Sequence, residues 1–133
     1  MAAIVQAQAD LILDETLGVS TPTLFTGQAY IRLTTTAPTA TAAGTELSGT
    51  GYTSGGSAIT FSSASAGSTT GPTSAMQWTN GSGSTWSIVG AEVWDSAGTP
   101  LRWWFGTFSG EPISVANGNV FQISASGITV SLT

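Results

Sequence analysis

The last third of the chain alternates large apolar residues with small or polar ones, in runs separated by turn residues. The runs cover residues 86–95, 101–108, 113–125 and 128–132, and the pair Asn117-Gly118 interrupts the third. A period of two is typical of strands that bury one face, and short strands joined by such turns indicate an antiparallel β structure. An antiparallel meander fits these spacings best, and the first two runs are predicted to form a hairpin.

Weaker strand signals precede this region. Residues 29–35 alternate, with Ile31 and Leu33 on one face and Arg32 on the opposite face, which predicts a strand. Two shorter strands are predicted over residues 57–61 and 75–79. No sharp change in composition divides the chain, so we expect one domain over residues 1–133.

A long loop is predicted between the first two of these strands. Residues 36–57 are rich in Thr, Ala, Gly and Ser, and Glu46, Leu47 and Tyr52 are the few side chains suited to pin them down. Loops of this length are usually either functional or mobile, so we expect one of these properties here.

The N-terminal segment, residues 1–18, follows a helical period instead. Its apolar positions repeat at helical spacing, and polar residues occupy another face. The apolar positions are Val5, Ala9, Ile12, Leu13 and Leu17, and the polar ones are Gln6, Asp10 and Asp14. Gly18 is suited to end the helix. The helix would either plug one end of its own domain, the favoured interpretation, or form an arm that lies on a neighbouring subunit.

Together these patterns predict a mainly β fold, an antiparallel β-sandwich or flattened barrel with one N-terminal α-helix. The core is expected to be thin, because many of the residues counted as hydrophobic are Ala. Part of the stability would then come from neighbouring subunits, which favours a homo-oligomer. Among homo-oligomers we favour a trimer.

The composition removes most routes to chemistry. The chain has no His, Cys or Lys, so it lacks an imidazole base, a thiolate, a Schiff-base amine and the usual zinc ligands. Glu92 and Asp95 would lie on opposite faces of one strand and are interpreted as solvated or capping carboxylates. Asp95 in particular begins a turn in which its side chain would bond the backbone. We therefore predict no catalytic residues, no bound metal and no cofactor.

Charge is scarce, at 7% of residues, and the net charge of −5 leaves only two cations. Too few positive side chains are present to follow a phosphate backbone, which argues against nucleic-acid binding. The first residues carry no positive charge, and Asp10 and Asp14 break the apolar run. Neither a signal peptide nor a membrane span fits, so synthesis in the host cytoplasm and no membrane contact are expected.

Tryptophan and arginine side chains are the candidates for contact with a partner. Trp103 and Trp104 are adjacent in a predicted strand, so they face opposite ways and at least one should leave the main core. An outward Trp could stack on a sugar, anchor a subunit interface or be covered by a loop. The candidate partner-contact residues are Arg32, Arg102, Trp104 and Trp78.

The order of several short motifs resembles a family of short virion proteins of tailed bacteriophages, variously labelled tail fibre, minor tail or head decoration proteins. A helix ending in Leu-Gly precedes the strand YIRLTTTAP, which is followed by ELSGTGY, WSIVGAEVWD, WFG and an Asn-Gly turn before two closing strands. The chain departs from the family where Thr53 and Ser54 replace a frequent Arg, and where Arg102 and Trp103 replace aliphatics. If those positions meet a partner, the partner surface differs.

The resemblance implies a non-enzymatic structural virion protein, and we expect a capsid decoration (cement) protein that contacts the major capsid protein and stabilises the head lattice. Small size without a fibrous repeat, low charge and a helix available as an arm motivate this expectation. A tail-fibre or tail-tip module that contacts tail proteins remains an alternative. A carbohydrate-binding module that uses an outward Trp104 or Trp78 is another.

Overall fold

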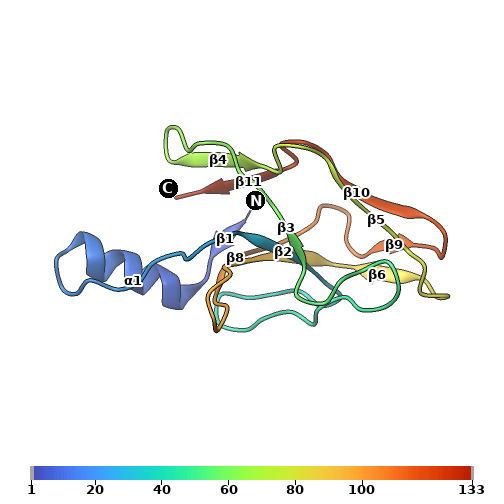
Figure 1. The fold of residues 1–133 in the computed structure, drawn as a ribbon, viewed down its shortest axis with the longest axis horizontal. Helices are drawn as coiled ribbons and strands as arrows, with labels where there is room; N and C mark the ends of the chain where they lie inside the picture. Colours follow the sequence, from blue (N-terminus) through green and yellow to red (C-terminus); the bar gives the residue numbers. More distant parts are fainter. Residues whose placement is uncertain (1, 133) are drawn as a thin grey trace.

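The computed structural model describes residues 2–132, which form one helix and eleven short strands (Figure 1). The largest sheet has five antiparallel strands in the order β1-β8-β7-β2-β3. These strands are β1 (Ala3–Ile4), β8 (Arg102–Thr107), β7 (Gly90–Trp94), β2 (Tyr30–Thr34) and β3 (Ser57–Ala58). The hairpin predicted in the last third is confirmed as β7 and β8.

The remaining strands pair in a nested order around that hairpin. β6 (Trp86–Ile88) pairs with β9 (Ile113–Val115), β5 (Met76–Thr79) with β10 (Val120–Ile123), and β4 (Ser68–Gly71) with β11 (Ile128–Ser131). Residues 68–131 therefore form one long, interrupted hairpin that folds over on itself. The predicted meander is wrong, because each closing strand pairs with a distant earlier strand instead of with its neighbour in sequence.

The strand predicted over residues 86–95 is divided at Val89. Its N–H donates to the carbonyl of Thr34, and its carbonyl accepts from the N–H of Phe108. The chain thus leaves β9 and joins β2 and β8 at this point. The single alternating run of residues 86–95 therefore contributes strands to two sheets. Its period of two alone does not reveal this division.

The long hairpin folds over on itself, so its strands lie in layers. Figure 1 shows β4 and β11 on one side of the five-stranded sheet, and the loop of residues 35–56 on the other. Ile31 and Leu33 are fully buried, as their alternation predicts. The expected mainly antiparallel β fold with one N-terminal helix is confirmed, in a sandwich-like arrangement. Within residues 2–132 the sheets do not close into a barrel.

The main core lies where the layers meet. It joins aliphatic side chains of the central strands to aromatic side chains of the nested pairs. Its buried members are Ile31, Leu33, Leu47, Tyr52, Ile59, Trp78, Trp86, Ile88, Val115, Phe121 and Ile123. Neither Trp103 nor Trp104 belongs to this cluster, so the expectation that at least one of them leaves the main core is confirmed.

The helix α1 (Gln6–Thr16) begins later than expected, because Ala3–Ile4 pairs with β8 instead. Met1, included in the predicted segment, lies outside the described residues, as does Thr133. Val5 is buried where the helix starts, whereas Leu13 is 55% exposed and Leu17 is 73% exposed. The favoured interpretation of a helix that plugs its own domain is therefore wrong. Leu11 and Ile12 are half-buried, and the outer end of the helix presents Leu13 and Leu17 to solvent.

The long loop is anchored along its length. Leu47 and Tyr52 are buried, the Leu47 N–H donates to the Leu33 carbonyl, and Glu46 forms an isolated bridge with Thr34. Glu46, Leu47 and Tyr52 therefore do hold the loop, as the sequence suggested. Gly56 has φ of +85° and lies so close to β2 that a Cβ atom there would meet the carbonyl of Ile31.

Candidate partner-contact site

The four candidate contact residues occupy three different environments. Arg32 and Arg102 lie on the face of the five-stranded sheet that the loop covers, since Arg32 is in register with Glu92 and Arg102 with Trp94. Trp104 lies on the opposite face, where it is in register with Val93. Trp78 is in the core. The structure therefore does not bring the four residues together into one site.

Arg102 is buried in an ion pair. Its Nη1 donates to Glu92 Oε1 at 3.1 Å, and the two side chains are 8% and 2% exposed. The same carboxylate accepts from the Gly44 N–H at 2.9 Å and from the Trp94 indole at 3.0 Å. The interpretation of Glu92 as a solvated or capping carboxylate is wrong. It ties the loop, β7 and β8 together, and one charged and two neutral donors satisfy it.

A β-bulge explains how Arg102 and its neighbour Trp103 are both buried. Val93 is in register with Trp104, but Trp94 is in register with Arg102, so β8 holds one extra residue. Strict alternation would have sent one of the pair outward. Arg102 and Trp103 are therefore interior residues and do not form an exposed partner surface.

Asp95 caps the turn between β7 and β8, as expected. Its Oδ1 accepts from the N–H groups of Ala97 and Leu101, and its Oδ2 accepts from the Trp103 indole at 3.0 Å. Burial works to raise the pKa of Asp95, but these hydrogen bonds together outweigh it and lower the pKa below its ordinary value. The charged form is the one that the turn stabilises.

Arg32 is the candidate cation that solvent still reaches. Its guanidinium lies 4.0 Å from the centre of the Trp94 ring and 3.9 Å from Glu46 Oε2, and the side chains of the ion pair are 21% and 26% exposed. Glu46 Oε1 also accepts from the Tyr52 hydroxyl and the Gly55 N–H, both at 2.8 Å. Sequence reasoning missed Trp94 and Glu46 as partners of Arg32, because both contacts depend on where the loop folds back.

Tyr52 connects this cluster to the core. Burial and the hydrogen bond to Glu46 raise its pKa well above its ordinary value. Its hydroxyl also accepts from the Leu33 N–H at 3.2 Å. The loop is therefore fixed to β2 by a neutral phenol that must keep its proton.

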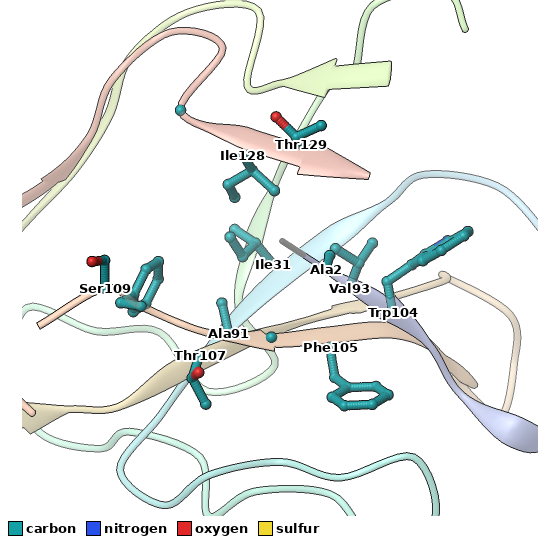
Figure 2. A pocket seen from close by; sticks show the side chains of 13 residues that line it. Ala2, Ile31, Ala91, Val93, Trp104, Phe105, Thr107, Ser109, Ile128 and Thr129 are labelled. Atoms are coloured by element: carbon teal, nitrogen blue, oxygen red, sulfur yellow. The ribbon is translucent and has the colours of Figure 1, made fainter. Parts of the chain in front are cut away.

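Trp104 borders an apolar space between the layers (Figure 2). Two adjoining cavities, of about 230 Å³ and about 260 Å³, share Trp104 and Val93 in their walls. Figure 2 shows Ile31 from β2 and Ile128 from β11 facing each other across the first cavity. Its walls hold no carboxylate or amide side chain. Trp104 thus borders a space walled mainly by apolar side chains, with hydroxyls from Thr107, Ser109 and Thr129, which suits an apolar side chain better than a sugar.

Trp78 packs inside the protein. Its ring lies 5.9 Å from that of Phe121 in a stacked arrangement, its indole donates to Ser57 Oγ at 3.2 Å, and only 5% of it is exposed. It therefore offers no exposed stacking surface in this chain. Arg32 and Trp104 remain the predicted partner-contact residues with accessible atoms.

The described part of the chain holds neither a metal-binding cluster nor a membrane-spanning helix. Among residues 2–132, no three His, Cys, Asp or Glu side chains come together in a way that would hold a metal ion. No helix in that range combines the length and the apolar character needed to cross a membrane.

Comparison with known families adds the decisive observation. The model of the family described as "Gp80: Podophage GP4 fiber I protein gp80" matches residues 3–131. The chain belongs to this family. The gp80 match spans the helix, the loop and every strand of both layers, and it confirms the resemblance to virion proteins of tailed phages. The chain is thus a fibre-related structural protein of a phage virion. No curated protein sequence matches it.

Proposed function

We propose that this gp80-family chain is a non-enzymatic fibre subunit of a podophage virion, mounted at the tail. The observation that carries the proposal is the match of a fibre protein family over residues 3–131. The tail position is the finer part of the proposal, because the family description names a fibre without saying where it stands.

The chemistry of the buried charges supports a structural role. Glu92 and Asp95, which would be the acid–base candidates, are engaged by backbone, indole and guanidinium donors. A carboxylate that is saturated with donors and closed off from solvent serves to hold backbone in place. The lack of His, Cys and Lys agrees with this role.

A capsid decoration protein is the second candidate. Its support is the compact, repeat-free body of a 133-residue chain, which suits a subunit that sits on a lattice. Both candidates share a structural role and differ in the partner: tail proteins for a fibre, the major capsid protein for a decoration protein. The two candidates are therefore distinguished by where the chain is located on the virion.

Electron cryomicroscopy of intact particles separates the two candidates. An antibody fragment raised against the folded chain would mark its position, and particles made without the gene serve as the control. Density at the tail supports the fibre proposal, whereas density spread over the head shell would replace it with the decoration role. Light scattering of the purified chain measures the oligomer, for which we expect a trimer.

A further inference from the structure

The N-terminal helix and the segment that returns from it project from the layered body (Figure 1). We call residues 6–26 the arm. Hydrogen bonds join the arm to the body near its two ends, from the Gln6 N–H to the Ala40 carbonyl and from the Ser96 N–H to the Thr26 carbonyl. Between these ends, the hydrogen bonds of residues 9–25 are all made within residues 5–26. The arm is therefore held near its base alone.

The arm carries an apolar patch formed by Leu13, Leu17 and Val19. These side chains are 55%, 73% and 71% exposed. Leu13 and Leu17 are neighbours on one face of the helix, four residues apart, and Val19 follows after the turn that ends the helix. Among residues 2–132 only one other large hydrophobic side chain, Leu132, is more than half exposed. Such a concentration of apolar surface in one projecting element marks a contact surface.

The charge of the arm restricts what can cover this patch. Asp10, Asp14 and Glu15 lie on the helix, and residues 6–26 contain no Lys or Arg. The two cations of the chain, Arg32 and Arg102, are each paired with a carboxylate of the same chain, Glu46 and Glu92. A second copy would therefore bring carboxylates to the arm, and both of its Arg side chains are already engaged within their own chain.

We infer that the arm docks into an apolar groove bordered by basic side chains on a different protein of the virion. This inference rests on the proposed function, because the partner is sought among the virion proteins. The groove would cover Leu13, Leu17 and Val19, and its Lys or Arg side chains would face Asp10 and Asp14, which neighbour the two leucines on the helix. The arm would attach the subunit, leaving the sheet body free.

Salt distinguishes this partner from a second copy. Attraction between the acidic helix and a basic groove is screened as ionic strength rises, so docking weakens with added salt. Contact between two acidic arms is opposed by repulsion, so screening would strengthen it. The two occupants therefore give salt dependences of opposite sign.

The first experiment is photo-crosslinking in intact particles. A photoreactive amino acid replaces Leu17, and in a matched control it replaces Val120, which is 49% exposed on β10 of the body. We expect Leu17 to crosslink to another virion protein at a segment that contains or adjoins Lys or Arg. A crosslink to a copy of the same chain, to an acidic segment or to nothing would overturn the inference.

The second experiment measures binding of the purified chain to particles made without its gene. We expect Leu13→Ser with Leu17→Ser to weaken binding at least tenfold, and Asp10→Asn with Asp14→Asn to weaken it and flatten its salt dependence. Val120→Ser is the control and should leave binding unchanged. Circular dichroism and thermal melting check that each variant is folded, which these exposed positions should permit.

The outcomes separate this inference from the proposed function. If mass spectrometry finds no copy of the chain in purified particles, the proposed function itself fails. If the chain is present but the arm variants bind as the unaltered chain does, or binding grows with salt, the inference alone is wrong.

Discussion

At the residue scale, Glu92 is a buried carboxylate on which three donors from three different segments converge. Its two oxygens accept from Arg102, from Trp94 and from the backbone of the loop at Gly44. A carboxylate that is 2% exposed is tolerable only while these donors surround it. Removal of one of these donors should therefore destabilise the protein.

We expect Arg102→Met to destabilise the protein by about 3–5 kcal/mol, because it leaves Glu92 buried without its cation. Arg32→Met is the matched control. Its ion pair is wider, at 3.9 Å, and partly exposed, so its loss together with the contact to Trp94 should cost at most about 2 kcal/mol. Urea unfolding followed by tryptophan fluorescence measures both.

The double variant Glu92→Gln with Arg102→Met tests the reason for this cost. It removes the buried charge together with its partner, so it should be more stable than Arg102→Met alone. Equal stability of the two variants would mean that packing, and not charge, explains the loss.

Tyr52→Phe is expected to cost about 1–3 kcal/mol at neutral pH, since the Leu33 N–H and Glu46 both lose a hydrogen-bond partner. The raised pKa of Tyr52 adds a pH dependence. Its stabilising effect is complete below the pKa of an unfolded tyrosine, about 10, and is lost as the pH rises above that value.

The free energy of unfolding of both proteins, measured between pH 8 and pH 11, checks this sign. The gap between the unaltered chain and Tyr52→Phe should narrow above pH 10, and a gap that widened there would contradict the assignment. Tyr30→Phe is the neutral-pH control, because no hydrogen bond joins the Tyr30 hydroxyl to any side chain in residues 2–132.

At the scale of elements, the loop of residues 35–56 acts as a third layer against the central sheet. Backbone contacts hold it to β2, and Glu92 of β7 accepts from the Gly44 N–H. Within the loop, Glu46 accepts from the Gly55 N–H and pairs with Arg32 of β2. Its many Gly, Ala and Thr residues are small enough to let the loop backbone lie close to the sheet, most clearly at Gly56. The loop is therefore attached to the sheet at several points along its length.

Adjacent glycines in this loop provide a matched test. Gly55 and Gly56 both have positive φ, but a Cβ on Gly55 meets no atom within 4 Å, whereas one on Gly56 would run into the Ile31 carbonyl. Gly55→Ala should cost about 1–2 kcal/mol from backbone strain. Gly56→Ala should cost about 1–3 kcal/mol more. Equal thermal shifts for the two variants would show that the loop is not packed on β2.

At the scale of the whole molecule, order is expected to decrease from the central sheet to the arm. β2 and β7 are interior strands with neighbours on both sides, β4 and β11 form a two-stranded layer, and the arm is attached near its base. An eleven-residue helix without tertiary support is marginal in water. Docking of the arm would change its order more than that of any other part.

Hydrogen exchange of the isolated chain measures this gradient. Amides of β2 and β7 should exchange most slowly, those of β4 and β11 faster, and those of residues 9–25 fastest. In assembled particles the arm should gain protection while β2 changes little. Slow exchange of the arm in the isolated chain would indicate that it is already covered, as by self-association.

Local patterns were sufficient for several features. The alternation around Ile31 and Leu33 gives the inward face of β2, the turn after Asp95 gives the β7–β8 hairpin, and the motif order gives the phage virion family. The first two depend on residues that are close in sequence, and the third on the order of short motifs along the chain. The non-enzymatic role stays a prediction that the composition favours.

The sequence by itself therefore determined the mainly β character, the inward face of β2 and the capped turn at Asp95, because periodicity and turn chemistry act over a few residues. Only the tertiary structure decided which strands pair, that Glu92 and Arg102 meet in the interior, and that the helix projects. Those outcomes depend on contacts between distant segments: the nested pairing, the bulge in β8 and the loop packed on the sheet. Burial in the whole molecule decides which distant segments come into contact, and the local sequence pattern does not encode that burial.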